Sequence, residues 1–174
     1  TSGRPSPTTA QHVWQDMEGK IEMILDGGPV GIGVESTIVD VSGDVPTLLR
    51  PGAITMEMLR ETVGRVEIDP AIQAPPSADL RPKAPGMKYR HYAPKAELTI
   101  FEGDNDRVVE KINELAGENE RKGLKVGILS STENEHRYTS GEVVVVGSRC
   151  DEHEVAAHLF DVLRHFDHID VDII

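Results

Sequence analysis

Six prolines between residues 70 and 96 constrain the fold more than any other feature, because helix interiors and central strands exclude proline. The stretch has neither helical nor strand periodicity, so we interpret residues 71–96 as a connector that its prolines make semi-rigid. It separates residues 1–70 from residues 97–174. A chain of 174 residues is long enough for two small domains on either side of such a connector.

Beyond the connector, strands and helices alternate, which is typical of a parallel sheet covered by helices. Four strands are predicted, at residues 97–101, 125–129, 142–146 and 170–174. Asp104 and Asp151 each precede apolar residues at helical spacing and predict two helix starts. Because the pattern stops on a strand, we expect a closing helix to be missing from this region. The predicted fold class is α/β.

Residues 1–70 combine short strands with two helices. Ser6 before Pro7 predicts the start of a helix that Gly19 ends. Thr55 predicts a second helix, over residues 56–63. Four further strands are predicted, at residues 21–25, 34–41, 47–50 and 65–69.

Charge and composition exclude several classes of protein. The net charge is −12, and residues 98–174 hold 8 Lys and Arg against 17 Asp and Glu, which disfavours nucleic-acid binding there. Residues 80–96 are the clear basic segment. One cysteine, Cys150, rules out an internal disulfide, and no window is apolar enough for a membrane helix, so we expect a cytoplasmic protein. The first residues contain neither Met nor a signal core, so we expect a cut inside a larger protein.

Two motifs in the first region could bind small polar ligands. A helix beginning at Ser6 would present backbone N–H groups and a positive dipole end to an anion, although Ser6 could equally be a plain cap. Glycines at 27–33 precede a predicted strand on which Ser36 and Thr37 point to opposite faces, so only one of them should meet a ligand squarely. A simple glycine-rich hairpin is the alternative interpretation.

Two further motifs carry cations and aromatic rings. Arg50 ends a predicted strand before a turn, where a guanidinium can bind phosphate through two hydrogen bonds or pair with a surface acid. Tyr89 and Tyr92 lie among Lys, Arg and His in the connector, where they could stack on a base or merely dock the connector. The histidines and Cys150 match no zinc spacing, so no metal site from protein side chains is predicted.

Together these segments resemble one family. The sequences Ser-Gly-x-x-Ser-Pro-Thr, Gly-Val-Glu-Ser-Thr-Ile-Val-Asp, Leu-Arg-Pro-Gly-Ala-Ile-Thr and Pro-Gly-Met-Lys-Tyr-Arg-His-Tyr-Ala-Pro occur here in this order. They resemble YrdC-type L-threonylcarbamoyl-AMP synthases of the longer, two-domain form. The resemblance implies the C-terminal part of a YrdC-type twisted sheet over residues 1–70, the connector, and a Rossmann-like domain over residues 97–174.

The resemblance also implies a reaction and a set of site residues. The family makes L-threonylcarbamoyl-AMP and pyrophosphate from L-threonine, bicarbonate and ATP with Mg²⁺, for N6-threonylcarbamoyladenosine in tRNA. Ser6 resembles an ATP contact, and Arg50 resembles the arginine at the nucleotide phosphates and is the catalytic candidate. Ser36 resembles a threonine-binding residue, with Thr37 as substitute. Tyr92, then Tyr89, resembles the connector residue at the ATP site.

Two other classes of function remain open from the residues alone: an RNA-binding module and a regulatory domain that binds a small ligand without catalysis. The acidic balance argues against the first, and we expect no direct tRNA binding and no membrane partner. The product would pass to the machinery that transfers threonylcarbamoyl to tRNA. Since the family's N-terminal half is absent from this sequence, we expect the 174 residues alone to be inactive.

Overall fold

The computed structural model describes residues 3–73 and 93–174 and shows a mixed α/β protein with two compact units. One unit joins Thr1–Gly33 with Tyr92–Ile174, and the other is Val34–His91. Within the described residues, no helix is long and apolar enough to cross a membrane. The division into domains at 1–70, 71–96 and 97–174 stays a prediction.

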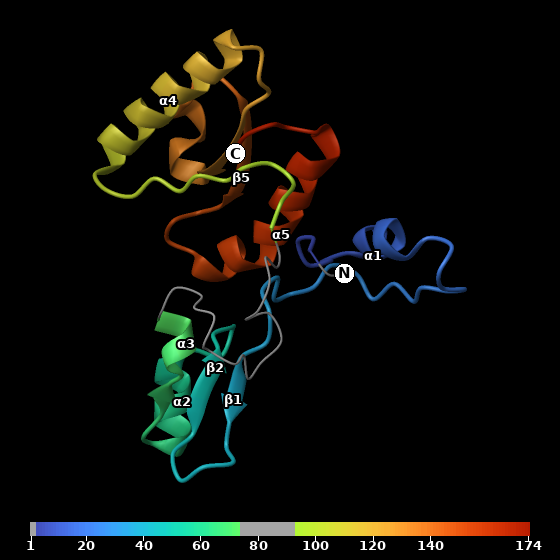
Figure 1. Ribbon diagram of the computed structural model, residues 1–174, viewed down its shortest axis with the longest axis vertical. Helices are drawn as coiled ribbons and strands as arrows, with labels where there is room; N and C mark the ends of the chain where they lie inside the picture. Colours follow the sequence, from blue (N-terminus) through green and yellow to red (C-terminus); the bar gives the residue numbers. More distant parts are fainter. Residues whose placement is uncertain (1–2, 74–92) are drawn as a thin grey trace. The chain divides into compact units, whose positions relative to one another are not determined.

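The unit Val34–His91 is built on a three-stranded sheet. Its order is β1 (Ile38–Asp40), β2 (Thr47–Arg50) and β3 (Glu67–Ile68), with β1 antiparallel and β3 parallel to β2. Helix α2 (Met56–Val63) connects β2 to β3, and the short helix α3 (Pro70–Gln73) follows (Figure 1).

Local signals account for most of this unit. Thr55 Oγ1 accepts a hydrogen bond from Met58 N at 3.3 Å, so the predicted cap of α2 is confirmed. The strand predicted at 47–50 is confirmed, whereas the strand predicted at 34–41 forms only over Ile38–Asp40. The strand predicted at 65–69 is likewise shortened, to Glu67–Ile68.

The C-terminal part of the other unit has the predicted parallel arrangement. Strand β4 (Gly127–Ser131) pairs in parallel with β5 (Glu142–Gly147), and a 3₁₀ helix, η1 (Thr132–Arg137), follows β4. Helix α4 (Asn105–Arg121) precedes β4, and α5 (Glu152–Ile169) follows β5. The strands predicted at 97–101 and 170–174 appear only as isolated parallel bridges, from Ile173 to Glu97 and to Val126.

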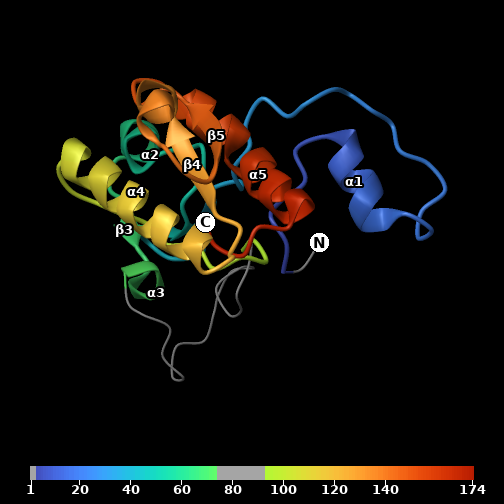
Figure 2. The ribbon, with the colours of Figure 1, turned by 90° about the horizontal axis from the view of Figure 1, so that it is seen from above.

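The two helices cover opposite faces of the β4–β5 pair (Figure 2). Ala116 of α4 packs with Val126 and Ile128 on one face. Phe166 of α5, which is fully buried, packs with neighbours on β5 on the other face. Asp104 and Asp151 cap α4 and α5 as predicted, each accepting a backbone N–H at the third helical position.

The N-terminal helix begins later than its sequence predicts. Helix α1 (Ala10–Met17) is capped by Thr9, whose hydroxyl accepts from His12 N at 3.3 Å, so the prediction that Ser6 caps this helix is wrong. The Thr8 N–H donates to the ring of His12 rather than to a capping serine. The predicted end is confirmed, since Gly19 takes a left-handed φ of 72° just after the cap residue Glu18.

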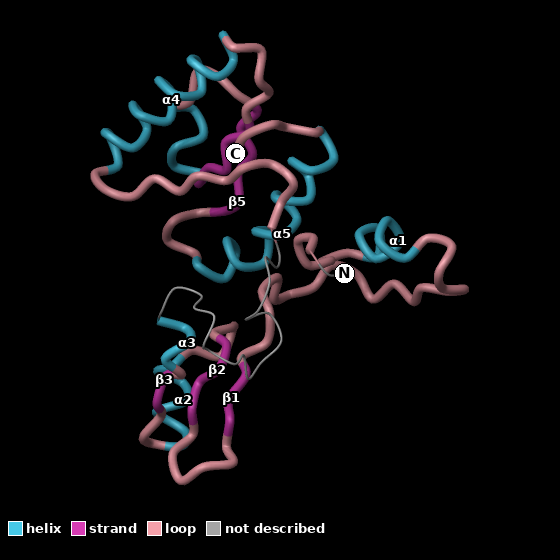
Figure 3. The backbone as a smooth tube through the Cα atoms, viewed as in Figure 1, coloured by secondary structure: helices cyan, strands magenta, loops and turns pink. Residues whose placement is uncertain are grey.

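The strand predicted at residues 21–25 is absent, and this stretch is loop (Figure 3). Its apolar side chains are exposed, Met23 at 74% and Leu25 at 89%. An apolar run becomes a strand only when another strand supplies hydrogen bonds, and none of the described strands lies beside this one.

Candidate functional site

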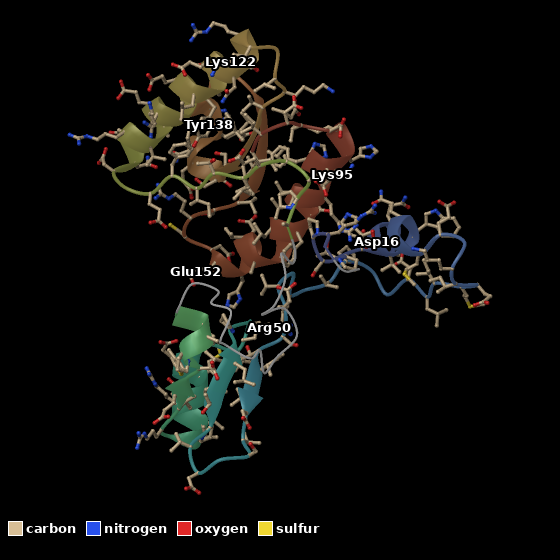
Figure 4. The ribbon with its side chains drawn as sticks, in the orientation of Figure 1. Asp16, Arg50, Lys95, Lys122, Tyr138 and Glu152 are labelled. Atoms are coloured by element: carbon tan, nitrogen blue, oxygen red, sulfur yellow. The ribbon has the colours of Figure 1, made fainter. Side chains whose placement is uncertain are left out.

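The hairpin of β1 and β2 brings two of the predicted site residues together. The register pairs Ile38 with Arg50, so the residues just before β1 lie beside the end of β2. Arg50 Nε donates to the backbone oxygen of Ser36 at 3.0 Å, and its Nη2 donates to Ser36 Oγ at 3.1 Å. The Arg50 guanidinium at the end of β2 is labelled in Figure 4. Two motifs that are distant in the sequence therefore form one surface.

A glycine makes this close approach possible. A Cβ atom on Gly52 would lie 2.3 Å from Glu35 O and 2.5 Å from Thr37 N, well inside van der Waals contact. Only a residue without a side chain lets the turn after β2 pack directly on the backbone of residues 35–37. Gly52 thus fixes the distance between Arg50 and Ser36.

Ser36 and Thr37 have different surroundings. The Thr37 hydroxyl donates to Ile54 O at 2.8 Å and accepts from Ile54 N at 3.1 Å, which ties the turn after β2 to the residue just before β1. Ser36 is exposed, and its hydroxyl faces the Arg50 guanidinium. Ser36 and Thr37 precede β1, so the strand expected to place them on opposite faces does not reach them. Their hydroxyls nevertheless differ, since one lies beside a cation and the other is engaged with backbone.

Arg50 keeps hydrogen-bonding capacity for a ligand. Two of its N–H donors point to Ser36, and in the described part of the chain no carboxylate pairs with it. A guanidinium carries five N–H donors in a planar fork, so three remain for an incoming anion or carboxylate. The interpretation of Arg50 as half of a surface ion pair finds no partner among these residues.

Ser6 belongs to the other compact unit, in a segment that charged side chains hold in place. Its backbone oxygen accepts from Arg164 Nε at 3.3 Å, and Pro5 O accepts from the same nitrogen at 2.9 Å. Asp16 on α1 pairs with Arg164 at 2.6 Å and with Arg4 at 3.2 Å (Figure 4). The segment is thus fixed by an ion-pair network rather than by a helix start at Ser6.

His12 reinforces the same segment. Its Nδ1 accepts from Thr8 N at 3.2 Å, so the proton of the neutral ring lies on Nε2, which faces Asp161 Oδ1 at 3.3 Å. Burial lowers the pKa of His12, and the nearby Arg164 charge lowers it further, against the raising effect of Asp161 and Asp16. The neutral His12 ring therefore makes the contacts with Thr8 N and Asp161.

The sequence does not reveal the structural role of several residues of these surfaces. The sequence places Gly52 in a turn but does not indicate its close contact, and no local pattern marks Arg4, Asp16 or Arg164. Arg164 and Asp16 are 148 positions apart, and no local pattern pairs residues at that separation. Tyr89 and Tyr92 lie outside the described residues. Among the described residues, no three His, Cys, Asp or Glu side chains gather as a metal site.

Comparison with known proteins assigns the family. A family model described as "Threonylcarbamoyl-AMP synthase, C-terminal domain" matches residues 54–174, well over half of the chain. The chain belongs to the threonylcarbamoyl-AMP synthase family. A second family model, for Sua5, YciO and YrdC proteins and described as "Telomere recombination", matches residues 1–52. The two matches meet at the turn that contains Gly52.

Curated threonylcarbamoyl-AMP synthases are similar over nearly all of the chain. The protein of Pyrococcus abyssi is 46% identical over 173 residues, which are 99% of this chain and 48% of that protein. The Bacillus subtilis protein is 44% identical over 173 residues, again 99% and 48%. The Schizosaccharomyces pombe protein is 41% identical over 182 residues, 99% and 44%. The chain thus spans about half the length of these relatives.

Two solved structures of P. abyssi Sua5 match the fold. The crystal structure complexed with L-threonine has a TM-score of 0.85 at 46% identity and covers 99% of this chain and 48% of that chain. A variant in which a histidine and the tyrosine after it are replaced by alanine has a TM-score of 0.86 at 44% identity, covering 98% and 47%. The described α/β arrangement is therefore that of Sua5 structures.

Proposed function

We propose that the protein containing this chain condenses L-threonine, bicarbonate and ATP into L-threonylcarbamoyl-AMP and pyrophosphate. The observation that carries the proposal is the pair formed by Arg50 and Ser36, which offers an open guanidinium fork beside an exposed hydroxyl. Membership of the threonylcarbamoyl-AMP synthase family and the match to a threonine-bound relative support this reaction.

The chemistry requires positioning more than a nucleophilic side chain. The threonine amine and bicarbonate form a carbamate with loss of water. A carbamate oxygen then bonds to the α-phosphorus of ATP, and the bond from that phosphorus to the β-bridging oxygen breaks, releasing pyrophosphate. Fixed cations that meet charge developing on the phosphates lower the barrier of such a step. Mg²⁺ enters with ATP as part of the substrate complex.

In this proposal Arg50 binds the nucleotide phosphates and Ser36 binds threonine. The three remaining N–H donors of Arg50 suit two oxygens of a phosphate group. Because Arg50 also donates to Ser36, the position of the threonine-binding hydroxyl is fixed relative to the phosphates. Thr37 is the weaker candidate for threonine, because both hydrogen-bonding roles of its hydroxyl are used by Ile54.

Ser6 is proposed to contact ATP from the segment before α1. Because α1 begins at Ala10, the contact would use the Ser6 hydroxyl and backbone instead of a helix terminus. Tyr92, and secondarily Tyr89, are proposed to contact ATP from the connector. One of the solved relatives carries alanine at a His-Tyr pair, and the one such pair in this sequence is His91-Tyr92.

The finer architecture is part of the same proposal. Residues 1–70 would be the C-terminal part of a YrdC-type twisted sheet, and residues 97–174 a Rossmann-like domain. Parallel pairing of β4 with β5 between α4 and α5 supports the second assignment. We propose a cytoplasmic enzyme that hands its product to the tRNA threonylcarbamoyl-transfer machinery without binding tRNA itself.

Product detection tests the proposal. The protein at its natural length is incubated with L-threonine, bicarbonate and MgATP, and threonylcarbamoyl-AMP is measured by mass spectrometry beside pyrophosphate. We expect product only when all three substrates are present. Arg50→Ala should lower kcat/KM at least about 100-fold, the size of effect that losing a charge-stabilising donor has in other enzymes. Arg60→Ala, an exposed arginine on α2, is the matched control and should stay within about twofold. Pyrophosphate release that is independent of threonine would overturn the proposal.

A further inference from the structure

Helix α5 has two packing faces. One face, which includes Val162 and Phe166, packs on β5. The second face contacts residues 3–33, and its members recur three or four positions apart, as residues on one side of a helix must. They are Ala157, Asp161 and Arg164. An element matched by the C-terminal domain model therefore also carries the segment that contains Ser6.

Arg164 makes the closest contacts of this second face. Its side chain is 7% exposed, and its Nη1 and Nη2 donate to the two carboxylate oxygens of Asp16 at 3.2 and 2.6 Å. Its Nε donates to Pro5 O at 2.9 Å and to Ser6 O at 3.3 Å. One guanidinium thus fixes both α1 and the backbone on either side of the Pro5–Ser6 peptide bond.

Two other contacts keep the same surfaces together. His12 Nε2 faces Asp161 Oδ1 at 3.3 Å. Gly33 lies against α5 so closely that a Cβ atom there would be 2.3 Å from Ala156 O. Because these contacts involve different residues of the segment, losing Arg164 alone should leave the segment attached while freeing the backbone at Ser6.

The orientation of the Pro5–Ser6 peptide follows from Arg164. In a trans peptide the N–H points opposite to the C=O. With Pro5 O directed at the guanidinium, the Ser6 N–H is directed away from α5. Arg164 therefore sets the direction in which the Ser6 N–H points.

We propose that Arg164 is a positioning residue for nucleotide binding, through which the C-terminal domain fixes the Pro5–Ser6 backbone of the ATP site. This inference rests on the proposed function, because Ser6 is an ATP contact only within it. Arg164 does not touch the nucleotide. It acts by holding in place, before ATP arrives, a segment that would otherwise lose conformational freedom on binding.

The test combines nucleotide affinity with backbone exchange in the natural-length protein. Binding of MgATP and of L-threonine is titrated separately, and amide hydrogen exchange is followed over residues 3–17. Arg164→Met should weaken MgATP binding at least tenfold (about 1.4 kcal/mol) while threonine binding changes less than about twofold. Exchange over residues 3–17 should accelerate at least about tenfold. Arg164→Lys keeps the charge and should recover part of the affinity. Arg107→Met, an exposed arginine on α4, is the control.

A paired variant guards against misfolding. Arg164→Met leaves the buried Asp16 carboxylate without its main partner, which can unfold a protein, whereas Asp16→Asn with Arg164→Met removes both charges. The pair should fold and still show weak MgATP binding. Wild-type protein that binds no MgATP would reject the proposed function itself. Wild-type binding that the pair retains in full, even with faster exchange, would reject the positioning role alone.

Discussion

Gly52→Ala tests whether the Arg50–Ser36 surface depends on direct backbone contact. The new Cβ would lie 2.3 Å from Glu35 O and 2.5 Å from Thr37 N. Reaching an ordinary contact distance means a displacement of about 1 Å, in a turn that Thr37, just before β1, already holds by two hydrogen bonds. Overpacking of this kind destabilises the folded protein by about 1–3 kcal/mol. Alanine also restricts the unfolded chain, which offsets about 0.4–1 kcal/mol of that loss.

The matched control is Gly43→Ala in the same unit, where a Cβ meets nothing within 4 Å. It should be neutral or stabilise by about 0.4–1 kcal/mol, so the two variants should differ by about 1–3 kcal/mol in the free energy of unfolding. Urea denaturation measures this difference, and L-threonine titration should show weaker binding for Gly52→Ala alone. If the two variants unfold within about 0.5 kcal/mol of each other and bind threonine equally, the close approach does not shape this surface.

Three further outcomes are expected. Because the pKa of His12 is lowered on folding, the unfolded chain binds more protons in acid, so stability should fall as pH drops below about 6.5. His12→Gln should remove that part of the pH dependence in denaturation curves, whereas His153→Gln, exposed on α5, should not. Asp151→Ala removes the carboxylate that accepts a hydrogen bond from Glu154 N at 3.0 Å, so the free energy of unfolding should fall by about 1 kcal/mol. Calorimetry measures this loss, and the control His153→Ala should leave the stability unchanged. Arg50→Lys keeps the charge but loses the planar fork, so threonylcarbamoyl-AMP formation should fall about 10–100-fold, and full activity would show that one point charge is sufficient.

The sequence predicts well those local features, such as helix caps, that depend on three or four neighbouring residues. Thr55, Asp104 and Asp151 cap their helices because a side-chain oxygen reaches an N–H three positions ahead whatever the rest of the fold does. Ser6 does not cap α1, because Thr9 lies nearer the apolar residues of the helix and accepts the N–H of its first turn.

What the sequence could not predict depends on distant partners. Residues 21–25 have a strand's composition but no described strand beside them, so the composition alone did not produce one. Arg164 and Asp16 form an ion pair although they are 148 positions apart, and the sequence around either residue does not indicate its partner. Arg50 and Ser36 meet through the β1–β2 pairing, whose register shifts between Ile38 and Val39, and the motifs taken separately did not predict that contact.

The proposed reaction requires that Ser36 binds threonine and that Arg50 and Ser6 each contact the nucleotide. A crystal structure of the natural-length protein with L-threonine and a non-hydrolysable MgATP analogue tests it directly. We predict Ser36 Oγ within hydrogen-bond distance of threonine, and both Arg50 and the Ser6 segment within hydrogen-bond distance of the nucleotide. Ligands bound elsewhere, or Ser6 and Arg50 on surfaces that share no ligand, would contradict the account.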